Sequence, residues 1–268
     1  MTTDNALVFW MSVLFPLTGI AFILIIRTLH QRYVLQRQQA GVGYLVELKK
    51  LLLLTQRHRG SSYGAINGDN ELRKVIPDIE RPIEECIRNL NKLGEAGRQK
   101  DHWLAFLDHW QRLQKNNLHI DAENNLAQHN QIISVLLYLL EDVAESACLN
   151  GNCQPSLEYI WRDLPRAAEL IGQARVLGSG IMASGSADSV HKIRMRFVRS
   201  RLEEFITDNG SADKKLLELM QVIDQQILQD GQRMSAREYF DLSTQAMEPF
   251  FRRIDEGLEG LKQQLRVH

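Results

Sequence analysis

The sequence predicts an all-α protein: two packed antiparallel four-helix bundles that follow one N-terminal transmembrane helix. Helix-forming residues dominate the 268-residue chain, whereas its 17 glycines and 6 prolines gather at a few breaks. No alternating apolar and polar run of β-branched residues is long enough to indicate a sheet. Between the breaks, apolar residues recur with helical spacing, and the short connections favour antiparallel packing.

The first predicted element is a membrane anchor at residues 6–26. This run carries no charged residue, and its 21 positions are enough to cross a hydrocarbon core of about 30 Å. Asp4 precedes it, whereas Arg27, Arg32 and Arg37 follow it, and positive flanks stay on the cytoplasmic side. The expected localisation is therefore the inner (cytoplasmic) membrane, single-pass, with the C-terminal domain in the cytoplasm.

The chain is expected to divide into five segments. Residues 1–5 form an N-terminal tail, 6–26 the transmembrane helix and 27–39 a juxtamembrane helix. Residues 40–262 form a helical domain, and 263–268 form a C-terminal tail. No internal repeat and no low-complexity tract subdivides the large segment.

In the first part of this domain, the juxtamembrane helix is expected to continue to about residue 60. Apolar residues surround it on nearly all sides, which is typical of a helix inside a bundle. Gly60 and the two serines after it are typical of a helix end, and the next segment carries an Asn-Gly turn signal. A helix over 71–94 follows, with breaks or kinks expected at Pro77 and Pro82.

The remaining helices are predicted by apolar rows between turn signals. They are expected at 100–115, 121–149, 156–183, 190–208, 213–228 and from 236 to the C-terminus. Ser235 and Glu238 have the spacing of a capping box, which indicates where the last helix begins.

Cysteine usage and the scattered histidines argue against several kinds of site. The three cysteines, Cys86, Cys148 and Cys153, give no full disulfide framework; the last two either pair across the turn between them or remain thiols. No Cys-x-x-Cys with partner histidines indicates a metal site. The serines near His58 lack an acid to orient a catalytic triad, so we expect neither an enzyme nor a cofactor.

The charge balance argues against a polyanionic partner. Formal net charge is −1, and the basic stretch at 191–201 lacks the interleaved aromatic residues of a nucleic-acid surface, so no nucleic acid is expected. This stretch is either a solvated face partly paired with Glu203 and Glu204, or a contact for anionic lipid or an acidic partner.

Two arginines stand on apolar helix rows without an acid one turn away. Arg59 continues the row of Leu45, Leu48 and Leu52, and none of its neighbours at three or four positions is acidic. Arg57 projects about 200° away from Arg59 on an ideal helix, so the two share a pocket only if the helix ends near the following glycine.

Arg175 is the second arginine of this kind. Glycines stand on both sides of it, at positions 172 and 178, and no acid occurs between Glu169 and Asp188. Arg237 is a third candidate one turn before Phe240, although Asp241 offers it a local salt bridge.

An inward guanidinium requires an acid or an anion, because an unpaired buried charge is costly. One interpretation is that other helices supply the acid, with Glu47, Glu141 and Glu145 available. The other is a small planar oxyanion held between helices, which suits the flat, bidentate guanidinium fork.

The stretches that carry these arginines resemble a known family. "LTQRHRGSS" (54–62) is similar to the Leu-Gln-x-Glu-Arg-Gly-x-Ser signature of the NIT domain, the nitrate- and nitrite-sensing domain of bacterial regulators. "LPRAAELIGQARVLGSG" (164–180) resembles its later Gly-x-x-Arg-x-x-Gly helix, and "SAREYF" (235–240) stands where the family has a further arginine. The likeness spans about residues 40–262, but His58 replaces the usual glutamate.

This resemblance implies two packed four-helix bundles that bind nitrate or nitrite between helices. The ligand-binding residues that it implies are Arg59, Arg175, Arg237, Arg57 and His58. The expected function is thus a membrane-anchored sensory domain that passes a change of helix packing to a separate signalling protein in trans, as a monomer or a homodimer. The alternative is a ligand-free, membrane-tethered helical scaffold or adaptor whose arginines are satisfied internally.

Overall fold

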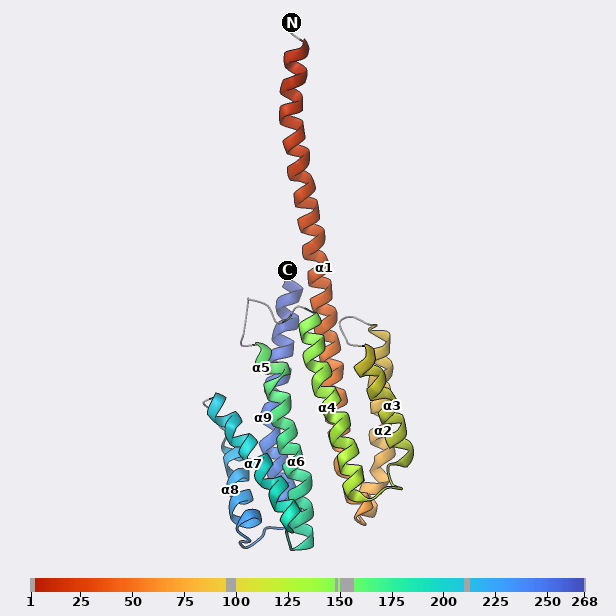
Figure 1. Cartoon of the computed structure of the whole chain (residues 1–268), viewed down its shortest axis with the longest axis vertical. Coiled ribbons are helices and arrows are strands. Elements are labelled where there is room, and N and C mark those ends of the chain that lie inside the picture. The colour runs from red at the N-terminus through yellow and green to blue at the C-terminus, as the bar shows by residue number, and fades with distance from the viewer. Residues whose placement is uncertain (1–2, 95–99, 148, 150–156, 210–212, 268) are drawn as a thin grey trace.

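The computed structural model of the chain describes residues 3–94, 100–147, 149, 157–209 and 213–267, with the backbone alone described for residues 3–16. These residues are largely helical and form no strand, which confirms the predicted all-α class. The elements are α1 (Thr3–Ile66), α2 (Asn70–Lys92), α3 (Lys100–Asn116), α4 (Ala122–Ser146), α5 (Glu158–Trp161), α6 (Asp163–Ser184), α7 (Ser189–Asn209), α8 (Lys214–Val222), the π-helix η2 (Ile223–Leu228) and α9 (Ala236–Val267) (Figure 1).

The helices form two groups that meet along α1, α6 and α9. In the first group α2 and α4 pack on α1, and α3 packs on α4; in the second group α6 packs on α7 and α9, and α8 packs on α9 (Figure 1). The Gln39 amide donates to the Leu265 carbonyl at 2.6 Å, and Lys49 pairs with Asp255 at 2.7 Å, so α1 and α9 run antiparallel. The finer arrangement as two four-helix bundles stays a prediction.

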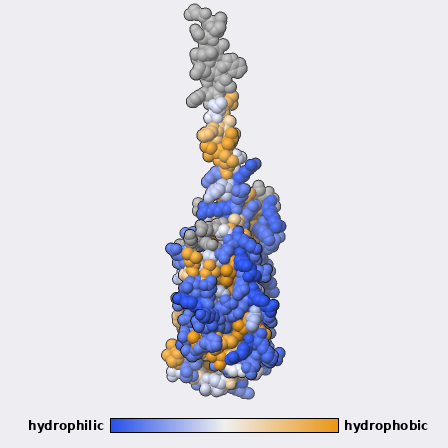
Figure 2. Space-filling model, turned by 90° about the vertical axis from the view of Figure 1, so that its right-hand side faces the viewer, coloured by the Kyte–Doolittle hydropathy of each residue, from blue (hydrophilic) through white to orange (hydrophobic). Residues whose placement is uncertain are grey.

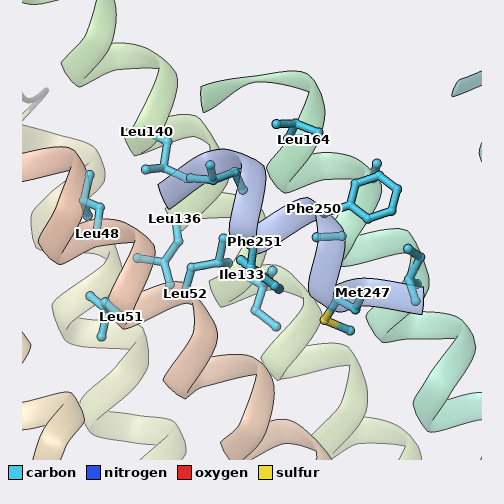
Figure 3. Close-up of a cluster of buried hydrophobic side chains, with 14 of the residues drawn as sticks. Leu48, Leu51, Leu52, Ile133, Leu136, Leu140, Leu164, Met247, Phe250 and Phe251 are labelled. Atoms are coloured by element: carbon cyan, nitrogen blue, oxygen red, sulfur yellow. The ribbon is translucent and has the colours of Figure 1, made fainter. Parts of the chain in front are cut away.

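One apolar core crosses from the first group to the second. Figure 3 shows Leu48, Leu51 and Leu52 of α1 facing the same buried cluster as residues of α4, α6 and α9. Ile133, Leu136, Leu140, Leu164, Met247, Phe250 and Phe251 complete the labelled part of this cluster. Burying a side chain of this size contributes about 1.5–3 kcal/mol, so the shared core holds the two groups together.

The first helix does not end at Gly60, and that prediction was wrong. α1 continues for six residues to Ile66. Ser61 and Ser62 are buried inside it, so packing on neighbouring helices overrides the local preference of a Gly-Ser-Ser run for a helix end. The chain turns at Gly68, whose φ of 102° suits glycine, and Asp69 caps α2 by accepting from the Glu71 and Leu72 amides.

The two prolines of α2 do not divide the helix. α2 runs from Asn70 to Lys92 through Pro77 and Pro82, whereas breaks or kinks were expected there. A proline inside a helix costs about 3 kcal/mol. The burial of one face of α2 against α1 offsets this cost. This face comprises Ile76, Ile79, Ile83, Cys86 and Leu90. Cys86 is a thiol, whereas the proposed Cys148–Cys153 pairing lies outside the described residues.

The membrane anchor predicted at residues 6–26 requires correction. The span lies in the part of α1 that extends beyond the helix groups (Figure 1), and the described apolar side chains from Leu17 to Ile26 are exposed there (Figure 2). In the part of the chain that the structure describes, no helix combines the length and the apolar character needed to cross a bilayer. The prediction of a single-pass inner-membrane protein depended on this anchor and is corrected with it.

Substituting Gly178 tests how closely α6 approaches α9. A Cβ atom at Gly178 would lie 2.2 Å from Cε1 of Tyr239, a buried ring whose hydroxyl donates to the Ala174 carbonyl. Gly178→Ala should therefore lower the free energy of unfolding by about 1–3 kcal/mol in a urea titration. Gly260→Ala, where nothing lies within 4 Å of the added carbon, should raise it by about 0.5–1 kcal/mol. Equal stabilities for the two variants would contradict the described contact.

Candidate functional site

A pocket of about 940 Å³ opens between α1, α6 and α9, with part of α2 at its edge. We call it the arginine pocket, because Arg57, Arg175 and Arg252 line it. Uncharged residues that line it include Leu53, Leu54, Gln56, Ser61, Phe240, Thr244 and Met247. The pocket follows the contact between the antiparallel helices α1 and α9, and Lys49 and Asp255, which form an ion pair, are among its lining residues.

Arg175 is a partly buried cation of this pocket with which no described carboxylate forms an ion pair, whereas Arg57 and Arg252 are exposed. Its Nη1 donates to Thr244 Oγ1 at 3.2 Å, and its guanidinium lies 4.9 Å from the centre of the Phe240 ring. Its Nε is buried and has no hydrogen-bond partner among the described groups. Burial, and then the nearby charge of Arg59, lower the pKa of Arg175 to about 10, against the opposing influence of Glu169. This guanidinium thus lines the pocket while one of its donors is buried without a described partner.

Arg59, in contrast, is held by an acid that the sequence interpretation did not consider. It is fully buried, and its Nη1 and Nη2 donate to Oε1 and Oε2 of Glu169 at 2.5 and 3.2 Å. Nη1 also donates to Asn130 Oδ1 at 2.8 Å. The pair joins α1 to α6, so the interpretation in which another helix supplies the acid describes Arg59. None of Glu47, Glu141 and Glu145 is that acid.

The other arginines of the predicted set are exposed. Arg57 lines the arginine pocket, although Gly60 does not end the helix as expected. Arg237 lies in the first turn of α9 and does not line this pocket, as far as the described side chains show. The structure therefore brings Arg57 and Arg175 to one cavity, places Arg59 behind its wall and leaves Arg237 outside. Their roles in ligand binding stay a prediction.

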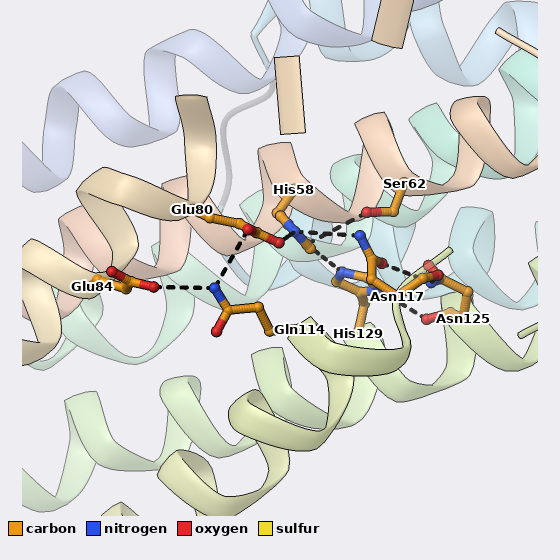
Figure 4. Close-up of polar contacts among 8 residues, drawn as sticks. All are labelled: His58, Ser62, Glu80, Glu84, Gln114, Asn117, Asn125 and His129. Atoms are coloured by element: carbon orange, nitrogen blue, oxygen red, sulfur yellow. Dashed lines mark hydrogen bonds and ion pairs between the residues drawn. The ribbon is translucent and has the colours of Figure 1, made fainter. Parts of the chain in front are cut away.

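His58 faces the opposite side of α1, within the first helix group (Figure 4). Its Nδ1 lies 2.8 Å from Nε2 of His129, and Nδ1 of His129 lies 2.8 Å from the Asn125 carbonyl. Because a carbonyl only accepts, His129 carries its proton on Nδ1 and accepts from His58 through Nε2. Nε2 of His58 then faces Oε1 of Glu80 at 3.3 Å and the Asn117 amide at 3.5 Å. His58 is thus part of a buried polar network and not of the arginine pocket.

This histidine network makes stability depend on pH. Burial, and then the charge of His58, hold the pKa of His129 well below 6.5. His129 therefore binds a proton more readily in the unfolded chain than in the folded protein. Its contribution to the free energy of unfolding is fully present above about pH 6.5 and is lost as pH falls toward the folded pKa. The free energy of unfolding should fall by up to about 1.4 kcal/mol per pH unit in this window.

Substituting His129 should flatten this dependence. His129→Gln is expected to be less stable than the unchanged protein at pH 7.5, because its neighbours lose a matched hydrogen-bond partner. Its free energy of unfolding should change less between pH 6.5 and 5. Urea titrations at each pH measure both effects, with His119→Gln, at an exposed position, as the control. An unchanged slope in the His129 variant would show that other groups cause the acid sensitivity.

Sequence reasoning missed Glu169 because its partner is 110 positions away along the chain. A signal was present: Glu169 is the one acid between Asp163 and Asp188 on a helix whose neighbouring positions are mostly apolar. The same limitation applies to Thr244 and Phe240, which reach Arg175 from α9, and to the asparagines around His58.

Comparison with known proteins supports the fold and not a family assignment. No family model matches this chain, and no curated protein matches it. The solved structure of the NasR transcription antiterminator is similar, with a TM-score of 0.67 and 16% sequence identity over 93% of this chain and 75% of that chain. At this identity the likeness shows a shared all-helical fold. The predicted assignment to the NIT family with a membrane anchor is corrected accordingly, because neither a family model nor a described spanning helix supports it.

Proposed function

We propose that this protein is a helical sensory domain that binds one small planar oxyanion, nitrate or nitrite, at Arg175. The observation that carries the proposal is the inward guanidinium of Arg175, which lines the arginine pocket without a carboxylate partner among the described residues. The fold shared with the NasR antiterminator, a regulator of transcription by its name, is consistent with a sensory role. The proposal involves no catalytic step and no further cofactor.

The donors around Arg175 suit such an anion. The terminal nitrogens of Arg175 can present N–H groups in one plane to a planar oxyanion in the pocket, whereas its Nε is buried. Arg57 is exposed at the rim and its long side chain offers a second guanidinium, and the Ser61 hydroxyl offers a neutral donor. Hydrogen bonds to charged groups contribute about 1.5–3 kcal/mol each, so three or four support micromolar affinity, about −8 kcal/mol.

Binding at this place would bias the packing of three helices. Arg57 belongs to α1, Arg175 to α6, and Thr244 to α9, so an anion held between them favours the arrangement in which they approach one another. A ligand shifts such an equilibrium by its difference in affinity for the two arrangements. A separate protein that contacts these helices would read the shift.

A second candidate function has one specific observation in its favour. The Arg59–Glu169 ion pair neutralises a buried arginine internally, as expected of a ligand-free helical scaffold or adaptor. Arg175 distinguishes the two candidates, because the scaffold provides no counter-charge for it.

Isothermal calorimetry of the protein with sodium nitrate and sodium nitrite, against sodium chloride at equal ionic strength, tests the proposal. We expect micromolar binding of one anion per chain and a matching increase in melting temperature, since a ligand at 100 times its Kd adds about 2.7 kcal/mol to stability. No heat and no melting shift with either anion at millimolar concentration would favour the scaffold.

A further inference from the structure

Glu169 occupies a complete oxyanion cage directly behind the arginine pocket. Its carboxylate is 5% exposed, and each of its two oxygens accepts two hydrogen bonds. Oε1 accepts from Arg59 Nη1 and from Gln173 Nε2 at 2.9 Å; Oε2 accepts from Arg59 Nη2 and from Gln56 Nε2 at 2.9 Å. This carboxylate is therefore fully satisfied and neutralises Arg59.

Gln56 and Met247 separate this cage from the pocket. Both residues line the arginine pocket. Gln56 also donates to Glu169, and a Cβ atom built at Gly172 would lie 3.5 Å from Met247 Cε and 3.6 Å from Glu169 Oε2. The charge of Glu169 is thus one side chain away from an anion bound at Arg175, in a region of low dielectric.

The charges that line the pocket leave a small positive excess. Five of the seven charged residues that line it are exposed and screened by water: Arg57, Arg252, Glu248, Asp255 and Glu256. The partly buried Lys49 pairs with Asp255, so the partly buried Arg175 supplies an excess of one positive charge. Behind the wall, Arg59 and Glu169 cancel each other. One singly charged anion therefore makes the site neutral, whereas a doubly charged anion would leave a negative charge in a partly buried position, which is costly.

We propose that Glu169 is the specificity-determining residue of this pocket, because by neutralising Arg59 it restricts the pocket to singly charged oxyanions and excludes sulfate and hydrogen phosphate. This inference rests on the proposed function for its ligand, but it assigns a different residue and a different property. Glu169 touches no bound anion in this arrangement. Glu169 acts by setting how many positive charges are available to a bound anion.

The test compares Glu169→Gln with Glu256→Gln. Both substitutions remove one negative charge and keep the side-chain shape, but Glu256 is an exposed pocket residue, whereas Glu169 is buried against Arg59. Sodium nitrate and sodium sulfate are titrated into each protein by calorimetry at pH 8 and constant ionic strength. Circular dichroism first establishes that each variant is helical and melts cooperatively.

In the unchanged protein, nitrate should bind and sulfate should bind at least tenfold more weakly. Glu169→Gln should strengthen sulfate binding at least tenfold and so remove the preference, because Arg59 becomes a second available charge. Glu256→Gln should change the nitrate-to-sulfate ratio by less than threefold, because water screens an exposed charge. A ratio in Glu169→Gln equal to that of the unchanged protein would overturn the proposal.

A double variant covers the case in which Glu169→Gln does not fold. Arg59→Met with Glu169→Met removes both charges, and apolar replacement of a buried ion pair is often tolerated. This variant should retain the preference for nitrate over sulfate, since the excess of one charge is unchanged; loss of the preference would refute the inference.

The failure of this inference is distinguishable from that of the proposed function. If the unchanged protein binds neither anion, while Glu169→Gln binds sulfate, the proposed function fails and the role of Glu169 as the internal counter-ion stands. If the unchanged protein binds nitrate, and every variant shows the same preference for nitrate over sulfate as the unchanged protein, the proposed function stands and Glu169 does not determine specificity.

Discussion

Arg175→Ala is expected to weaken nitrate and nitrite binding by about a hundredfold or more in calorimetry. The variant removes two charge-assisted hydrogen bonds to the anion, each contributing about 1.5–3 kcal/mol. The melting temperature without anion should change little. Loss of the contacts to Thr244 and Phe240 is offset by removal of a guanidinium that burial disfavours, as the lowered pKa of about 10 indicates.

Two further variants isolate the guanidinium geometry. Arg175→Lys keeps the charge but not the planar fork, so it should bind more weakly than the unchanged protein and more tightly than Arg175→Ala. Arg253→Ala removes an exposed arginine of α9 that does not line the arginine pocket, and its affinity should equal that of the unchanged protein. If Arg175→Ala bound nitrate normally, the anion would have to be placed elsewhere.

Arg59→Ala should lower the free energy of unfolding by about 3–5 kcal/mol, because the Glu169 carboxylate then lies buried without its counter-charge. Urea titration of the variant and of the unchanged protein measures this difference.

The control for this prediction is an exposed ion pair. Arg201 and Glu204 of α7 are both about half exposed, so Arg201→Ala should change stability by less than about 1 kcal/mol. The Arg59→Met, Glu169→Met double variant should be more stable than Arg59→Ala, because it leaves no unpaired charge. If Arg59→Ala were as mild as Arg201→Ala, the buried ion pair would not stabilise the contact between α1 and α6.

Local signals predicted most of the helical elements. The apolar spacing predicted α3 and α7 to within about two residues, and the capping box at Ser235 and Glu238 is present, with Glu238 accepting from the Ser235 amide at 2.8 Å. The same local signals failed at Gly60 and Pro77, where burial against neighbouring helices outweighs the preference of the residue itself.

The candidate site could be predicted only in part, for a related reason. That Arg175 lacks an acid on its own helix is visible in the sequence, and the structure brings it to a pocket with Arg57. The different situation of Arg59 could not be predicted, because Glu169 reaches it across the contact between two helix groups. Helical spacing indicates which residues share a face, whereas the partner opposite that face depends on tertiary packing.

The side chains of four consecutive residues of α1, Gln56 to Arg59, leave the helix about 100° apart around its axis. Arg57 therefore lines the arginine pocket, while His58 contacts His129 on the other side of the helix. A rotation of α1 that is favoured by contacts on the Arg57 side therefore also moves His58. If nitrate binding changes the proton affinity of His129 by some factor, thermodynamic reciprocity requires that protonation of His129 changes the affinity for nitrate by the same factor. The same helix would then respond both to the proposed anion and to pH.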